Sequence, residues 1–103
     1  MVNKLVRDNI PTVIKKTGKI PIYQCIDNNA EFVRLLNRKL QEEVTEYLES
    51  NCVIELCDVV EVVAALINAH GISQAEFEHL HIGKAIRNGT FNERGFLSGI
   101  MDK

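Results

Sequence analysis

Residues 29–71 read NAEFVRLLNRKLQEEVTEYLESNCVIELCDVVEVVAALINAHG, and most of the information about the fold is in this segment. In its first half, apolar residues recur at steps of three and four, which is the period of an amphipathic α-helix. Asn28 and Glu31 stand at the start of this run in the N-x-x-E arrangement typical of a helix cap. We therefore expect a helix from about residue 29 to residue 49.

The second half, after Ser50-Asn51, predicts another helix that ends near Gly71, a residue suited to the position just beyond a helix. Apolar side chains cover well over half of its circumference. The polar residues that interrupt this surface are Glu55, Asp58, Glu61 and Asn68. A helix this apolar is buried on most sides. Because so short a chain can hardly cover it alone, we expect self-association into a homodimer or a homotetramer.

The flanking segments complete an all-α expectation. Pro11 falls in the first turn of a short helix that Gly18 would end. Residues 19–26 predict a short edge strand or an extended arm. Ser73-Gln74-Ala75-Glu76 is a capping box that opens a helix running to about Arg87.

Residues 88–96 are Gly-rich and are expected to fold back over the domain as a loop or tail. The predicted architecture is a single domain, residues 1–103, built as an antiparallel helical bundle with a short extended N-terminal arm. Oligomerisation would complete the bundle.

Composition limits the partners of the chain. Its 12 Lys and Arg against 14 Asp and Glu give a net charge of −2, so no global attraction to a nucleic-acid polymer or to a membrane surface is expected. No apolar run approaches the roughly 18 residues of a membrane span. The first eight residues lack the apolar core of a secretory signal, which favours a cytoplasmic location. The three cysteines, Cys25, Cys52 and Cys57, form no CxxC pair and are expected to be buried free thiols.

Two acidic clusters carry the candidate chemistry. They are Glu42-Glu43-x-x-Glu46 on the first long helix and Glu55-x-x-Asp58 on the second. A helical projection places Glu43 inside the apolar arc, with Glu46 beside it and Glu42 farther out. A carboxylate that faces the core needs a partner, because burial disfavours its charged form.

The short link around Ser50-Asn51 predicts that the two long helices are antiparallel neighbours. Residues equally far from the turn then lie at the same height, so Glu46 would face Glu55 and Glu43 would face Asp58. A divalent cation would relieve the repulsion within this set, and all-oxygen ligands suit Mg²⁺, with Mn²⁺ as a substitute. The alternative is that the acids pair on solvated faces with basic residues, namely Arg34, Arg38, Lys39 or Lys84.

EExxE followed by ExxD on consecutive helices resembles the MazG-like all-α nucleotide pyrophosphohydrolases. That group includes phosphoribosyl-ATP pyrophosphohydrolase and the dimeric dUTPases and dCTPases. The opening residues 3–11, NKLVRDNIP, are similar to the N-terminus of a phosphoribosyl-ATP pyrophosphohydrolase-like branch, as is the closing pattern K-x-x-R-x-G-x-F-x-x-R-G-F of residues 84–96. The resemblance spans nearly the whole chain.

This resemblance implies a Mg²⁺-dependent hydrolase that splits an α–β phosphoanhydride and releases a monophosphate and pyrophosphate. By the likeness, the metal ligands are Glu43, Glu46, Glu55 and Asp58. Glu42 would assist nearby, and Lys84 and Arg87 would contact phosphates. Only eight residues, Tyr47 to Ile54, separate the two motifs, fewer than in many relatives, so the rim of the substrate pocket is expected to differ.

The chemistry also suits the residues themselves. Either Glu42 or Glu46 could act as the catalytic group that orients or deprotonates a water. Further candidate substrate-binding residues are Lys39, Asn68 and Arg7. Lys4, Arg7 and Asp8 could fold over the site and touch phosphate, or they could cap the first helix and pair with each other.

We therefore expect a nucleoside triphosphate as substrate, with noncanonical and deoxy nucleotides among the candidates. Two alternatives are the phosphoribosyl-ATP pyrophosphohydrolase reaction of histidine biosynthesis and a non-catalytic helical module that binds nucleotide or metal and oligomerises.

Overall fold

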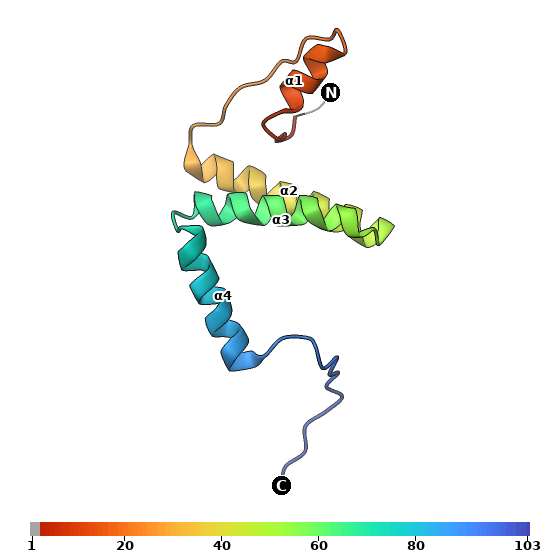
Figure 1. Ribbon diagram of the computed structural model, residues 1–103, viewed down its shortest axis with the longest axis vertical. Helices are drawn as coiled ribbons and strands as arrows, with labels where there is room; N and C mark the ends of the chain where they lie inside the picture. Colours follow the sequence, from red (N-terminus) through yellow and green to blue (C-terminus); the bar gives the residue numbers. More distant parts are fainter. Residues whose placement is uncertain (1–2) are drawn as a thin grey trace.

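A computed structural model describes residues 3–103 of the chain, so Met1 and Val2 lie outside the described part. It contains four helices, shown in Figure 1: α1 (Ile10–Lys16), α2 (Asn29–Ser50), α3 (Val53–Ala69) and α4 (Gln74–Asn88). The all-α prediction is confirmed. Within residues 3–103 there is no strand, and residues 19–26, for which an edge strand or an arm was expected, form an extended arm between α1 and α2.

Local capping explains where the helices begin. The Asn28 side chain accepts a hydrogen bond from the amide of Glu31 at 2.9 Å, as its N-x-x-E pattern predicted. At α4, the Ser73 hydroxyl accepts from the Glu76 amide at 3.1 Å, and the Glu76 carboxylate accepts from the Ser73 amide at 3.2 Å. The predicted capping box is therefore confirmed. Pro11 lies in the first turn of α1, where its missing N–H is not needed.

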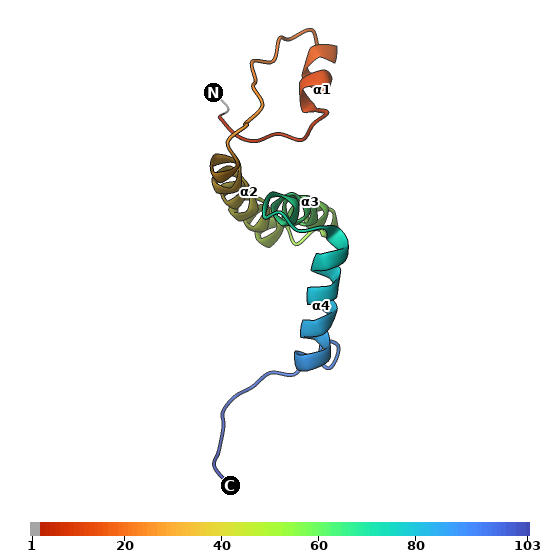
Figure 2. The ribbon, with the colours of Figure 1, turned by 90° about the vertical axis from the view of Figure 1, so that its left-hand side faces the viewer.

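Helices α2 and α3 form an antiparallel pair along their length (Figures 1 and 2). At the tight end, Asn51 adopts the left-handed conformation with φ 54°, and its amide donates to the Tyr47 carbonyl at 2.7 Å. At the open end, the Asn29 side chain donates to the Ala69 carbonyl at 3.0 Å. The Asn51 cap ends α2 and turns the chain, and the contact of Asn29 with Ala69 joins the two helices at the other end.

The remaining elements do not close a bundle around this pair. Figure 1 shows α4 leaving the end of α3 and running away from α2, while α1 stands apart on the other side. The chain measures 68 × 32 × 20 Å and has a radius of gyration of 18.5 Å. A compact domain of this length has a radius of gyration of about 13 Å. The expectation that the C-terminal segment folds back is wrong, because residues 89–103 extend away from the helices (Figures 1 and 2).

Few apolar side chains are buried as a result. Among residues 3–103, the buried large hydrophobic side chains are Leu36, Val62 and Ile67. Elsewhere on α3, Val53 is 77% exposed and Val60 is 65% exposed. A single chain therefore leaves much of the apolar surface of α3 uncovered.

The prediction of buried thiols is also wrong, because Cys25, Cys52 and Cys57 are all exposed. Cys25 lies on the extended arm, Cys52 is the N-cap of α3 and Cys57 lies in the second turn of that helix. Within residues 3–103, no helix combines the length and the apolar character that crossing a membrane requires.

Candidate metal centre

Three carboxylates from two helices meet beside the tight end of the pair. Glu43 comes from α2, and Glu55 and Asp58 come from α3. One oxygen from each lies within 4.8 Å of the other two. Mg²⁺ binds oxygens at 2.0–2.1 Å, so its opposite ligands lie about 4 Å apart. Small side-chain rotations would therefore bring these three oxygens to the spacing of a common cation.

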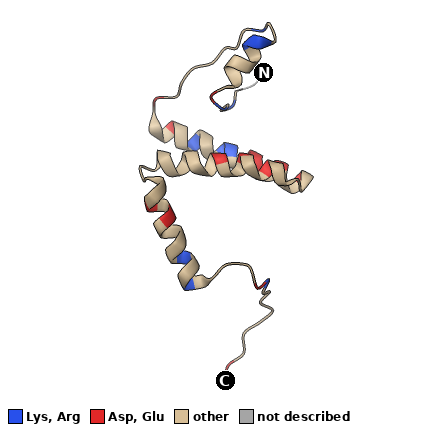
Figure 3. Ribbon diagram, in the orientation of Figure 1, with Lys and Arg blue, Asp and Glu red and all other residues tan. Residues whose placement is uncertain are grey.

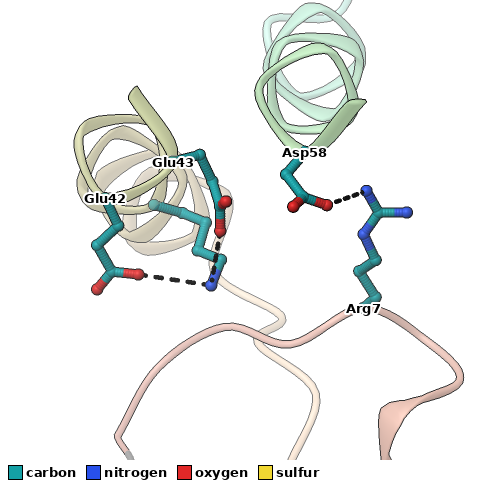
Figure 4. A network of polar contacts seen from close by, with 5 residues as sticks. Arg7, Glu42, Glu43 and Asp58 are labelled. Carbon is teal, nitrogen blue, oxygen red and sulfur yellow. Dashed lines mark hydrogen bonds and ion pairs between the residues drawn. The ribbon is translucent and has the colours of Figure 1, made fainter. Parts of the chain in front are cut away.

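Glu43 is the buried member of this cluster, with 6% of its surface exposed. Its Oε1 atom lies 3.2 Å from the Lys39 ammonium, whereas its buried Oε2 atom has no hydrogen-bond partner. A buried acceptor without a partner is costly, and more so when it is charged. In Figure 4 the Glu43 carboxylate points into the space between α2 and α3, toward Asp58. The residues present therefore fit a hard divalent cation.

Basic side chains of the protein also contact the cluster. Arg7 donates from Nη2 to Asp58 Oδ1 at 2.7 Å, and Lys39 lies 3.4 Å from Glu42 as well as close to Glu43 (Figure 4). Lys39 therefore pairs with two of the acids, Glu42 and Glu43, as the alternative interpretation of the acidic clusters predicted. Arg34 instead pairs with Glu31 at 3.0 Å, outside the cluster.

Glu46 lies next to these groups, and its pKa is raised above the ordinary value of 4.5. The main cause is the negative charge of Glu43, followed by the hydrogen bond that a protonated Glu46 can donate to Glu43. Desolvation and Glu55 raise the pKa further, and Lys39 opposes them. Carboxylate crowding at this end of the helix pair therefore makes Glu46 easier to protonate than an isolated glutamate.

The exposed face of α2 carries an open depression of about 450 Å³ beside the cluster. It is lined by Arg38, Gln41, Glu42, Thr45 and Glu46. All five residues belong to α2, so the depression has only one wall in a single chain. Glu42 and Glu46 thus lie on the solvent side of the helix, whereas Glu43 faces α3.

The structure does not bring all the predicted binding residues together. Lys84 and Arg87 are exposed on α4, and Figure 3 shows the basic residues, in blue, on the lower part of that helix, away from the acidic part of α2 and α3. Asn68 is exposed near the end of α3. It follows Asp58 by ten residues, or roughly 15 Å along the helix.

No protein-family model, curated protein or solved structure matches this chain. The resemblance to MazG-like pyrophosphohydrolases therefore stays a prediction that depends on the sequence motifs and on the geometry of the carboxylates.

Sequence reasoning named Lys39 among several possible partners of the acids but did not assign it to Glu43, although their i,i+4 spacing on one helix favours that contact. It also did not single out Gln41 and Thr45 beside Arg38, which follow the three- and four-residue steps of one helix face. The contact between Arg7 and Asp58 had no local signal, because 51 positions separate the two residues.

Proposed function

We propose that this protein is a cytoplasmic, Mg²⁺-dependent nucleotide pyrophosphohydrolase that converts a nucleoside triphosphate to a monophosphate and pyrophosphate. The observation that carries the proposal is the buried Glu43, which has one unpartnered carboxylate oxygen and belongs to a cluster with two carboxylates of the neighbouring helix. A chain that buries a carboxylate among other acids without a function would lose stability. A cation site explains why the arrangement is present.

Each group has a distinct part in this reaction. Glu43, Glu55 and Asp58 would hold the cation, which neutralises phosphate charge and makes bound water more acidic when it is present. Glu46 lies beside them, its pKa is raised mainly by the charge of Glu43, and its carboxylate would accept a proton from the attacking water.

Glu42 lines the depression next to Glu46 and can orient the same water. Lys39 and Arg7 already lie at the cluster, and both can bind phosphate oxygens.

Self-association is part of the proposal. The exposed apolar surface of α3 needs cover, and the depression on α2 lacks a second wall. Closed homo-oligomers are the commonest way to cover such a surface. We propose a homodimer or a homotetramer, in which a neighbouring copy supplies that wall. Sedimentation equilibrium should then give a mass of at least two chains.

The activity is tested by incubating the purified chain with Mg²⁺ and a panel of nucleotides. The panel should include canonical, deoxy and noncanonical triphosphates and phosphoribosyl-ATP. We expect equal amounts of monophosphate and pyrophosphate, and no turnover with EDTA. Glu43→Gln and Asp58→Asn should each lower kcat by about a hundredfold or more, because they remove ligand charge from the cation. Glu49→Gln, on α2 outside the cluster, is the matched control and should stay close to wild type.

Several results would contradict this function. Orthophosphate as the first product would exclude cleavage between the α and β phosphates. Turnover that survives chelation would exclude the cation. Tight nucleotide binding without any turnover would instead support the non-catalytic module.

A further inference from the structure

The segment of residues 3–9, here called the N-terminal strap, contacts the metal centre from outside the two long helices. Arg7 reaches Asp58 on α3 at 2.7 Å (Figure 4). Lys4 and Leu5 line a small crevice with side chains of α2, among them Lys39 and Glu42. The strap therefore touches both helices at the height of the acidic cluster, although it precedes α1 in the chain.

The Arg7 guanidinium acts as an internal counter-cation for the cluster. It contacts a carboxylate that also belongs to the group of three oxygens within 4.8 Å. The contact is exposed, with 54% of the Arg7 side chain and 40% of the Asp58 side chain accessible. Ion pairs this exposed are held weakly. The Arg7 and Asn9 carbonyls accept hydrogen bonds from the Ile10 and Val13 amides of α1 at 3.0 Å, but the Arg7 side chain takes no part in them, so it can leave Asp58 without breaking a helical hydrogen bond.

Lys39, the other basic residue at the cluster, is held differently. Its side chain is 21% exposed, and it pairs with both Glu42 and Glu43 on its own helix. It therefore has less freedom to leave than Arg7 has.

We propose that the strap is a cation-gated latch: Arg7 binds Asp58 in the ion-free protein, and a divalent cation at the cluster displaces it, which leaves its guanidinium available to the phosphates of the nucleotide. The proposal rests on the proposed function, because it uses the same cation site. It adds an order of events, in which the cation binds first and prepares the phosphate-binding group.

Simple electrostatics explains the exchange. A dication and a guanidinium that share one carboxylate repel each other at short range. A triphosphate offers Arg7 a more negative partner, and guanidinium groups match phosphate oxygens in a bidentate geometry. The Asp58 carboxylate, which holds Arg7 in the ion-free protein, thus binds the cation instead, and Arg7 binds the phosphates of the substrate.

The first test is Mn²⁺ binding to the full chain, measured through the electron paramagnetic resonance signal of free Mn²⁺. If Arg7 competes with the cation, Arg7→Ala should bind Mn²⁺ more tightly than wild type, by about three- to fivefold given the usual strength of exposed ion pairs. Lys15→Ala removes one positive charge from the exposed end of α1 and should bind as wild type does. Weaker binding by Arg7→Ala would mean that Arg7 positions Asp58 for the ion, and would overturn the latch.

The second test follows the strap directly. Heteronuclear ¹⁵N NOE values for the amides of residues 4–9 should fall when Mg²⁺ is added to the wild-type chain, and they should be low in Arg7→Ala with or without Mg²⁺. Values that do not change in wild type would overturn the latch.

These outcomes separate the two proposals. If wild type and Arg7→Ala bind Mn²⁺ equally well, and the NOE values of the strap do not change with Mg²⁺, only the latch fails. If neither wild type nor Arg7→Ala binds Mn²⁺, the cation site of the proposed function fails and the latch fails with it.

Discussion

At the scale of single residues, the centre is defined by where each carboxylate points. Glu43 is buried and faces α3, whereas Glu42 is exposed one position earlier in the chain. Successive residues on a helix differ by about 100° in direction. That rotation separates a group that can hold a cation from a group that faces the open depression on α2.

Glu46 gives this crowding a measurable pH dependence. Its pKa is raised in the folded chain, mainly by the charge of Glu43, so the folded state binds the Glu46 proton more tightly than the unfolded state does. The Glu46 contribution to the free energy of unfolding therefore decreases as pH rises above about 4.5, the ordinary value for the group. In metal-free protein at pH 7, Glu46→Gln should be more stable than wild type, and the difference should vanish at low pH.

The measurement is urea denaturation of both proteins with EDTA, from about pH 4 to pH 8. Glu49→Gln corrects for the loss of one negative charge from α2. A difference between wild type and Glu46→Gln that stays constant across this range would show that the two carboxylates are not coupled. Added Mg²⁺ should stabilise both proteins, because Glu46→Gln keeps the three carboxylates that would hold the cation.

At the scale of elements, the turn between α2 and α3 sets which acids face each other. Asn51 reverses the chain in the left-handed conformation, and the Ser50 hydroxyl accepts a hydrogen bond from the Cys52 amide at 3.1 Å. A turn of different length would shift α3 along α2 and separate Asp58 from Glu43. The short link is thus the element that makes the cluster.

Asn51 should tolerate only residues that accept a positive φ. Asn51→Ala should lower the free energy of unfolding by about 1 kcal/mol, because a Cβ next to the following carbonyl disfavours the left-handed conformation. Asn51→Gly has no such clash and should stay within about 0.5 kcal/mol of wild type. Urea denaturation of the three proteins checks this, and equal losses for both variants would contradict the role assigned to the left-handed turn.

At the scale of the whole molecule, a single chain leaves the proposed site open, because the depression beside the acids is lined by α2 alone. Helix α4 leaves α3 at the end far from the acids, so Lys84 and Arg87 cannot complete the centre of their own chain in this arrangement. The acidic region of the helix pair and the basic part of α4 carry opposite charge (Figure 3). If the proposed function is right, the cations of α4 would act on the acids of a second copy.

A mixing experiment tests this exchange between subunits. One chain carries Glu43→Gln, and the other carries Lys84→Ala with Arg87→Ala. Each should be nearly inactive alone, but a mixed dimer would contain one intact site. Random mixing of a two-fold symmetric dimer should restore about a quarter of wild-type activity. Native mass spectrometry should confirm that mixed dimers form, and mixed dimers without activity would refute a shared site.

Local physics made much of this protein predictable from its sequence. The periodicity of apolar residues, the Asn28 cap and the Ser73–Glu76 capping box act within a few positions, so they predicted the long helices and their starts. The same periodicity placed Glu43 on the buried side, and the short link predicted that Asp58 would face it. These are effects of neighbours in the chain, which the sequence shows directly.

Contacts between distant segments were decided only in three dimensions. The pairing of Arg7 with Asp58, the exposure of the three thiols, the direction of α4 and the course of residues 89–103 depend on how elements pack. Such packing reflects small differences between large opposing free energies. No local pattern of residues encodes these contacts and directions, because they join segments that are far apart in the chain.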